Sequence, residues 1–199
     1  MKLIVGLGNP GIWYAHSRHN IGSSIIKGLA QHYKLALKKD NAVSALSAKA
    51  DIEGHLVVVA VPGTFMNLSG NAVGALLRKY RVNLSDLLIV CDDLDLEFGR
   101  LRIKACGSSG GQRGLKSIID SLKSQEFARL RVGIDRPGKS EKVVSDYVLS
   151  SFSRAEKKQL DEVTAKAIEC CQMWVRDGID VSMNVFNKKE KKQMKGKQE

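Results

Sequence analysis

Long apolar runs are absent from this sequence of 199 residues. No segment approaches the roughly 20 apolar residues that a membrane-spanning helix requires. The apolar run at residues 3–5 is too short to be the core of a secretory signal peptide. We therefore expect a cytoplasmic protein with no membrane partner. A chain of this length is typical of one domain that buries its own core.

The four cysteines lack the Cys-x-x-Cys spacing of a zinc site or a redox pair. Cys170 and Cys171 are neighbours, which suits neither zinc ligation nor a disulfide of ordinary geometry. We expect all four thiols to be reduced and mainly structural.

Acidic residues are missing from the first part of the chain, where Asp40 is the first. The whole chain carries a net charge of +11. Residues 188–199 hold six lysines and two glutamates, which is +4 of that total and leaves +7 on the body. A polyanion such as nucleic acid is the expected partner. General solubility is the alternative explanation, and the basic end reads as a solvated tail.

Hydrophobic periodicity predicts alternating strands and helices. Strands are expected at 2–5, 43–51, 56–61, 87–91, 100–105 and 130–134, with the second and third forming a hairpin around Glu53-Gly54-His55. Helices are expected at 21–33, 72–80 and 115–122, and Ser153 with Glu156 resembles a capping box for a long helix that ends near Gly178. This alternation indicates one α/β domain, a three-layer α/β/α sandwich, and the hairpin makes its sheet mixed.

The glycines at Gly6-x-Gly8-x-x-Gly11 match the pattern of a dinucleotide-binding turn. That turn requires a helix to begin among the glycines and an acid about 20 residues later. Pro10 interrupts this segment, and helical periodicity begins only near Ile21. We therefore favour a tight loop that holds Asn9 and His19 above the sheet edge, and we expect no cofactor.

Two candidates for chemistry remain, and no Gly-x-Ser-x-Gly elbow accompanies them. Asp92-Asp93-x-Asp95 ends a predicted strand and could bind Mg²⁺, form a solvated loop or orient a histidine. His19 lies in a polar loop beside a sheet edge, whereas the other histidines look like surface or packing residues. A metal-free hydrolase that uses a histidine base and water is compatible with this pattern.

Five blocks of sequence resemble the bacterial peptidyl-tRNA hydrolase family, in family order between about residues 3 and 149. They are Asn9-Pro10-Gly11 with Tyr14 and Arg18-His19-Asn20-x-Gly22, Phe65-Met66-Asn67-x-Ser69-Gly70, Asp92-Asp93-Leu94-Asp95-Leu96 with Gly99, Gly107-Ser108-Ser109-Gly110-Gly111 with Gly114-Leu115-Lys116-Ser117-Ile118, and Arg129-Leu130-Arg131-Val132-Gly133-Ile134.

The resemblance implies a monomeric α/β sandwich with a mixed, twisted sheet, which would occupy residues 1–187 and leave 188–199 as the tail. It also implies hydrolysis of the ester that joins a peptide to the 3′ end of tRNA, without a metal. His19 would be the proton acceptor and Asp92 would orient it. Asn9 and Asn67 would bind the peptide backbone, and Tyr14 and Phe65 would contact the 3′ end of the tRNA, with Met66 lining the cleft. Lys104 and Arg131 would hold the tRNA 5′-phosphate.

One block departs from the family pattern. Many relatives carry His-Asn where this chain has Gln112-Arg113. The family's asparagine contacts substrate, so Arg113 is expected to contact it with a donor-only group, and the pair is expected to alter the lip of the cleft. This departure is also the one feature that favours an alternative, an RNA-binding protein that keeps the fold without hydrolysis.

Overall fold

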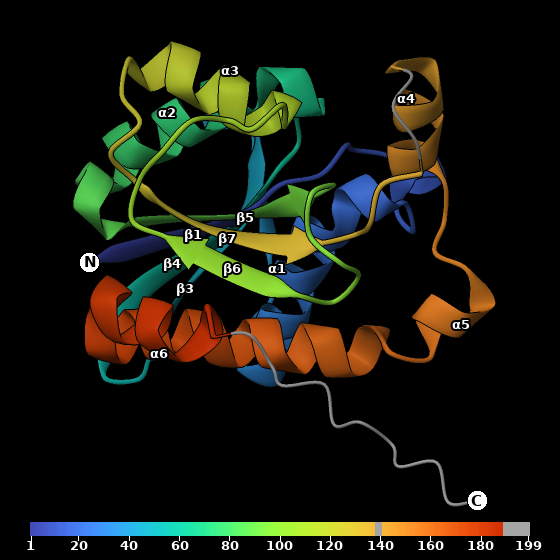
Figure 1. The fold of residues 1–199 in the computed structure, drawn as a ribbon. Coiled ribbons are helices and arrows are strands. Elements are labelled where there is room, and N and C mark those ends of the chain that lie inside the picture. The colour runs from blue at the N-terminus through green and yellow to red at the C-terminus, as the bar shows by residue number, and fades with distance from the viewer. Residues whose placement is uncertain (138–140, 189–199) are drawn as a thin grey trace, which may run out of the picture.

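The computed structural model describes residues 1–137 and 141–188. Strands and helices alternate along the chain (Figure 1). The strands are β1 (Lys2–Gly6), β2 (Lys38–Asp40), β3 (Ala45–Ile52), β4 (His55–Pro62), β5 (Leu87–Asp93), β6 (Leu101–Lys104) and β7 (Ala128–Gly133). The α-helices are α1 (Ile21–His32), α2 (Ser69–Tyr80), α3 (Arg113–Leu122), α4 (Glu141–Leu149), α5 (Arg154–Lys157) and α6 (Leu160–Phe186). The 3-10 turns are η1 (Ile12–Tyr14), η2 (Arg18–Asn20), η3 (Met66–Leu68) and η4 (Leu84–Asp86).

All seven strands join one mixed sheet in the order β2-β3-β4-β1-β5-β7-β6. The four central strands are parallel, and an antiparallel strand pairs at each side. The predicted hairpin is confirmed, with Ile52 opposite His55. Its turn consists of Glu53 and Gly54, both at positive φ, which is the geometry of the tightest hairpin connection.

Helices cover both faces of the sheet, so the predicted three-layer fold is confirmed (Figure 1). Alternating strand residues supply two apolar cores. One core holds α1 and α6 against residues such as Ile4, Val90 and Leu130. The other holds α2 and α3 against residues such as Val5 and Ile89. All four cysteines are free, and three of them are buried in these cores.

The long C-terminal helix differs from its prediction. Ser153 and Glu156 do form a capping box, but they cap the short α5, and α6 begins separately at Leu160. Gly178 has a non-helical conformation with φ of 84°, yet helical structure resumes after it as far as Phe186. The predicted tail lies outside the described residues from 189 onward. Within the described ranges, no helix is both long enough and apolar enough to span a membrane.

The fold opens a crevice where helices leave adjacent parallel strands on opposite sides. The chain passes from β1 to α1 on one face and from β4 to α2 on the other. Such a reversal is where open α/β sheets bind ligands, beyond the carboxyl ends of the strands. Gly22 lets α1 lie close to the sheet, because a Cβ there would collide with the carbonyl oxygen of Val90. This close approach brings the turn before α1 to the end of β5.

Candidate active site

A cleft of about 530 Å³ lies at the carboxyl ends of β1, β4 and β5. Its walls come from the segments that follow these strands, from the glycine-rich loop before α3 and from α4. Nine of the ten predicted site residues line the cleft: Asn9, Tyr14, His19, Phe65, Met66, Asn67, Asp92, Arg113 and Arg131. Lys104 lies elsewhere, near the end of β6.

His19 and Asp92 form a buried pair in this cleft. Nδ1 of His19 lies 2.8 Å from Oδ2 of Asp92. His19 is 8% exposed and Asp92 is 2% exposed. A carboxylate only accepts hydrogen bonds, so Nδ1 carries the proton and Nε2 is left with its lone pair. The sequence placed these residues in separate blocks, and the structure brings them into contact.

Opposing influences act on the pKa of His19. Burial is the largest and lowers it, because the charged imidazolium loses solvation. The charge of Asp92 and its hydrogen bond raise the pKa, and Arg113 lowers it through its positive charge. The net result is a pKa above the ordinary value of about 6.5. A larger share of His19 is therefore protonated near neutral pH than an unperturbed histidine would be.

Gln112 lines the interior of the cleft and is buried, so it does not lie on the exposed lip where the sequence led us to expect an effect. It is 8% exposed. Its Nε2 donates to Oδ1 of Asp92 at 2.9 Å and approaches Sδ of Met66 at 3.3 Å. Its Oε1 accepts from the backbone N–H of Leu115 at 2.7 Å and so caps α3. Arg113, by contrast, is exposed at the cleft mouth, as expected.

Asn9 links the loop after β1 to the turn after β4. Its Oδ1 accepts from the backbone N–H of Met66 at 2.8 Å, and its own backbone exchanges two hydrogen bonds with the side chain of Asn20. Within the described residues, Nδ2 of Asn9 has no partner. The side chain thus offers a donor to the cleft, while its acceptor atom is already used.

Aromatic residues form one wall of the cleft. Tyr14 and Phe65 meet edge to face with ring centroids 6.5 Å apart. Phe65 is 53% exposed, whereas Met66 beside it is buried at 3%. Asn67 is exposed and lines the same wall. The wall therefore presents aromatic faces and an amide to any bound molecule.

The three carboxylates of the Asp92-Asp93-x-Asp95 cluster turn to different partners. Asp92 contacts His19 and Gln112, Asp93 pairs with Arg131, and Asp95 pairs with Arg136. Of the three readings left open by the sequence, the orientation of a histidine describes Asp92.

Arg131 is enclosed on the face of the sheet that carries α3. Its guanidinium donates to Oδ2 of Asp93 at 3.0 Å and to the carbonyls of Ser108 and Ser109 at 3.1 and 2.8 Å. Strands β6 and β7, which carry the two cations expected at the tRNA 5′-phosphate, are neighbours. Lys104, however, lies opposite Arg129 and only diagonal to Arg131. The structure therefore presents the two cations differently, since Arg131 is paired with protein groups and Lys104 is exposed, and their contact with the 5′-phosphate stays a prediction.

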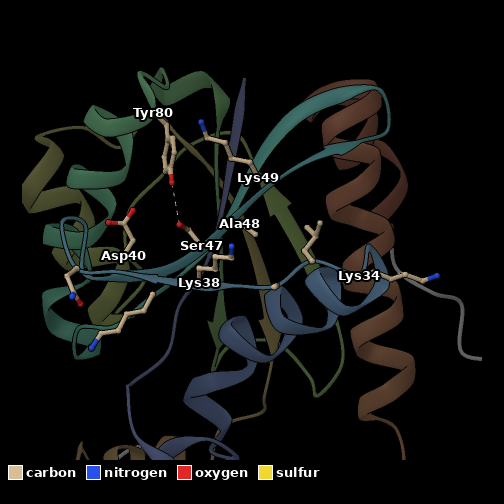
Figure 2. Close-up of a pocket in the computed structure, with 11 residues that line it drawn as sticks. Lys34, Lys38, Asp40, Ser47, Ala48, Lys49 and Tyr80 are labelled. Carbon is tan, nitrogen blue, oxygen red and sulfur yellow. Dashed lines mark hydrogen bonds between the residues drawn. The ribbon is translucent and has the colours of Figure 1, made fainter.

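A second hollow lies at the β2 edge of the sheet and carries several lysines. Its lining includes Lys34, Lys38 and Lys49, with the hydroxyls of Ser47 and Tyr80 hydrogen-bonded to each other. Figure 2 shows these lysine side chains pointing in different directions, so that they do not converge on one point. Lys79 pairs with Asp40 there. The hollow lacks the buried acid-base pair that marks the cleft.

Comparison with known proteins assigns the chain to a family. A family model described as peptidyl-tRNA hydrolase matches residues 3–195. The chain belongs to the peptidyl-tRNA hydrolase family. Curated family members include peptidyl-tRNA hydrolases from Sulfurihydrogenibium, 46% identical over 189 residues with 94% of this chain and 98% of the relative covered, and from Syntrophomonas wolfei, 42% identical with 94% and 100% covered.

The fold is also that of the peptidyl-tRNA hydrolase family. The crystal structure of the Acinetobacter baumannii peptidyl-tRNA hydrolase superposes with a TM-score of 0.89 at 37% identity, and the match covers 94% of each chain. The mixed sheet and its two helical layers are thus shared with an experimental structure.

Sequence reasoning missed the part of the cleft that α4 supplies. Val144, Ser145, Val148 and Leu149 line it, and Arg136 lies beside them. Figure 1 shows α4 beyond the carboxyl ends of β5 and β7. The spacing of Val144 and Val148, four residues apart, is the signal that could have predicted an apolar helix face here.

Arg18 links the turn that carries His19 to the segment from the end of α4 to α5. Its guanidinium contacts both carboxylate oxygens of Glu156 at 2.7 and 3.0 Å, and the carbonyl of Ser151 at 2.6 Å. It also lies over the rings of Tyr147 and Phe152, at 4.3 and 5.0 Å from their centroids. The residue next to His19 in the family block is therefore structural and joins the two sides of the cleft.

Proposed function

We propose that this protein hydrolyses the ester between a peptide and the 3′-terminal ribose of tRNA, with His19 as the general base. The observation that carries the proposal is the buried His19–Asp92 pair at the base of a cleft, in a chain of this family. We propose that it acts as a cytoplasmic monomer, without metal or cofactor, and recycles tRNA.

The base acts through the nitrogen that Asp92 leaves free. Nε2 of His19 takes a proton from water as the water oxygen attacks the ester carbonyl carbon. The resulting tetrahedral intermediate collapses by breaking the bond to the ribose oxygen. The imidazolium then returns the proton to that oxygen, which leaves a peptide with a free carboxyl group and a tRNA with a free 3′ end. General-base action of this kind contributes roughly 10²–10⁴ in rate.

The tetrahedral intermediate carries a negative oxygen that requires hydrogen-bond donors. Asn67 is the first candidate because its amide is exposed along the cleft wall. A backbone N–H of the glycine-rich loop is the second, since Gly110 and Gly111 also line the cleft.

Asn9 is suited to recognise the amide that distinguishes peptidyl-tRNA from aminoacyl-tRNA. Its Oδ1 is bonded to the N–H of Met66, which favours donation from Nδ2 to the substrate's amide carbonyl. An aminoacyl-tRNA has no such carbonyl and would leave the donor unpaired. Sites of this kind reject the wrong substrate strongly.

The tRNA would bind along the aromatic wall and the exposed cations. Tyr14 and Phe65 offer ring faces to the unpaired 3′ end, with Met66 lining the cleft beside them. Lys104 and Arg113 offer positive charge to phosphates. The role of Arg131 is indirect in this arrangement, because it holds the loop above Asp93.

The test is turnover of a peptidyl-tRNA mimic by His19→Ala. We expect kcat to fall by at least 10² while folding and tRNA affinity stay close to those of the wild type. His32→Ala is the matched control, because His32 is exposed on α1 and remote from the cleft. Near-normal turnover by His19→Ala would refute the base assignment, and tRNA binding without turnover by the wild type would favour the RNA-binding alternative.

A further inference from the structure

Gln112 stands where many relatives carry a histidine, and its side chain can lie in only one orientation. The backbone N–H of Leu115 is a donor, so it requires the oxygen of the Gln112 amide. The carboxylate of Asp92 accepts only, so it requires the amide nitrogen. Both requirements assign Oε1 and Nε2 in the same way. Each polar atom of this buried side chain is thereby committed.

These bonds connect three elements at the reacting centre. The Asp92 carboxylate at the end of β5 receives Gln112 on Oδ1 and His19 on Oδ2. Gln112 is the N-cap residue of α3. The absence of a side chain at Gly114 leaves room for Gln112 and Met66, because a Cβ on Gly114 would lie 2.5 Å from Sδ of Met66 and 3.0 Å from Oε1 of Gln112. A carboxylate held at both oxygens cannot rotate away from the imidazole.

We propose that Gln112 is a positioning residue for the His19–Asp92 pair, in which a permanently neutral amide fixes the carboxylate from the side opposite the histidine. The residue touches neither reacting atom and acts through Asp92. The inference rests on the proposed function for its effect on rate, but the geometry it describes can be tested without turnover.

Neutrality is the property that separates this amide from the histidine of relatives. A second imidazole this close to the pair would titrate together with it, and the two protons would leave in coupled steps. An amide has no such step, so the hydrogen bond to Asp92 persists across the working range of pH. The charged or titratable groups facing His19 within the described part of the cleft are then Asp92 on β5, Arg113 on α3, Tyr14 on η1, and the paired Asp93, Arg131 and Arg136.

Two variants separate positioning from helix capping. Gln112→Ser keeps a good N-cap residue but is too short to reach Asp92. Gln112→Glu keeps a carboxylate oxygen for Leu115 and replaces the donor by an anion facing Asp92. We expect Gln112→Ser to keep the thermal midpoint near that of the wild type, and Gln112→Glu to lower it because it buries a second carboxylate against Asp92. Both should lower kcat at least tenfold with KM changed less than threefold, and both should raise the pKa of His19.

The pKa of His19 is read by an NMR titration of its imidazole, with the signals of the three exposed histidines as internal references. Gln112→Glu is expected to shift that pKa upward, because it adds negative charge beside the pair. Gln31→Glu, an exposed change of the same chemistry on α1, should leave kcat and the His19 titration unchanged. Gln112→His should keep kcat within about tenfold and make the His19 titration biphasic.

The outcomes distinguish this proposal from the proposed function. A wild type that hydrolyses no peptidyl-tRNA, with His19 still shifted in both variants, would overturn the function and keep the positioning role. Wild-type kcat and an unshifted His19 in Gln112→Ser would overturn the positioning role and leave hydrolysis standing. A single unshifted titration in Gln112→His would refute the claim that a neutral group matters here.

Discussion

The negative charge of Asp92 reaches His19 across one hydrogen bond of 2.8 Å and raises its pKa. A general base works only when neutral, so turnover should increase as pH rises through the pKa of His19. Asp92→Asn removes the charge, so we expect the midpoint of kcat against pH to move to lower pH, and kcat at the plateau to fall because the tautomer is no longer held. A pH profile of both proteins measures this, and an unchanged midpoint would make Asp92 merely structural.

Arg113 acts on the same imidazole with the opposite sign, because its positive charge lowers the pKa of His19. Arg113→Asn should therefore move the midpoint of the pH profile to higher pH. It should also change KM more than kcat, since Arg113 is exposed in the lining of the cleft and we assign it to substrate binding. Steady-state kinetics at several pH values test both effects. A loss of kcat by orders of magnitude would place Arg113 in the chemistry.

The glycine-rich loop before α3 is held to β7 by two arginines. Arg129 is fully buried and donates to backbone carbonyls, including those of Gly107, Gln125 and Phe127. Arg131 joins the same loop to Asp93. Together they fix the backbone that leads to Gln112. The two guanidinium groups thus provide hydrogen-bond donors for loop carbonyls that would otherwise be buried without partners, and this holds the glycine-rich loop in one conformation.

This arrangement predicts different effects for substitutions of Arg131 and Lys104, the two residues expected at the tRNA 5′-phosphate. Arg131→Met should lower the free energy of unfolding by about 3–5 kcal/mol, because it leaves Asp93 buried without its partner. Lys104→Met should change it by only about 0.5 kcal/mol, as an exposed substitution. Urea denaturation measures both. Equal stability of the two variants would mean that the Asp93–Arg131 pair contributes nothing to the fold.

Binding provides the complementary test of Lys104. Removal of the 5′-phosphate from the tRNA should raise KM for the wild type but not for Lys104→Met, since a terminal phosphate carries more charge than an internal one. If both proteins respond equally to dephosphorylation, Lys104 does not contact that phosphate.

The charge of the whole molecule acts at longer range. A body of +7 with a tail of +4 should attract tRNA and release counterions from it, so affinity should fall steadily as salt rises. Shortening the chain to residues 1–187 should reduce the slope of log affinity against log salt without changing kcat on a bound substrate. Filter binding over a salt series measures this, and an identical slope would show that residues 188–199 do not meet RNA.

Some features of the molecule follow from residues close together in the chain. The alternation of apolar residues predicted the central strands, and Glu53-Gly54 predicted the hairpin that makes the sheet mixed. The capping box at Ser153 is likewise local, since it needs a residue only three positions away. The sequence blocks also indicated His19 and Asp92 as the residues of interest, because each lies at the end of a predicted strand or in the loop after one.

Other features depended on packing between distant segments. His19 and Asp92 are 73 residues apart, and their contact exists because α1 lies close enough to β5 at Gly22. The three polar residues of β2 form a strand because the edge of β3 is available for pairing. Helix α4 lines the cleft because the chain after β7 passes over the carboxyl ends of the central strands. Gln112 is buried and Arg131 is paired for the same reason. Periodicity determines which face of an element is apolar, whereas the partner of a buried polar group is decided by whichever segment the tertiary structure brings beside it.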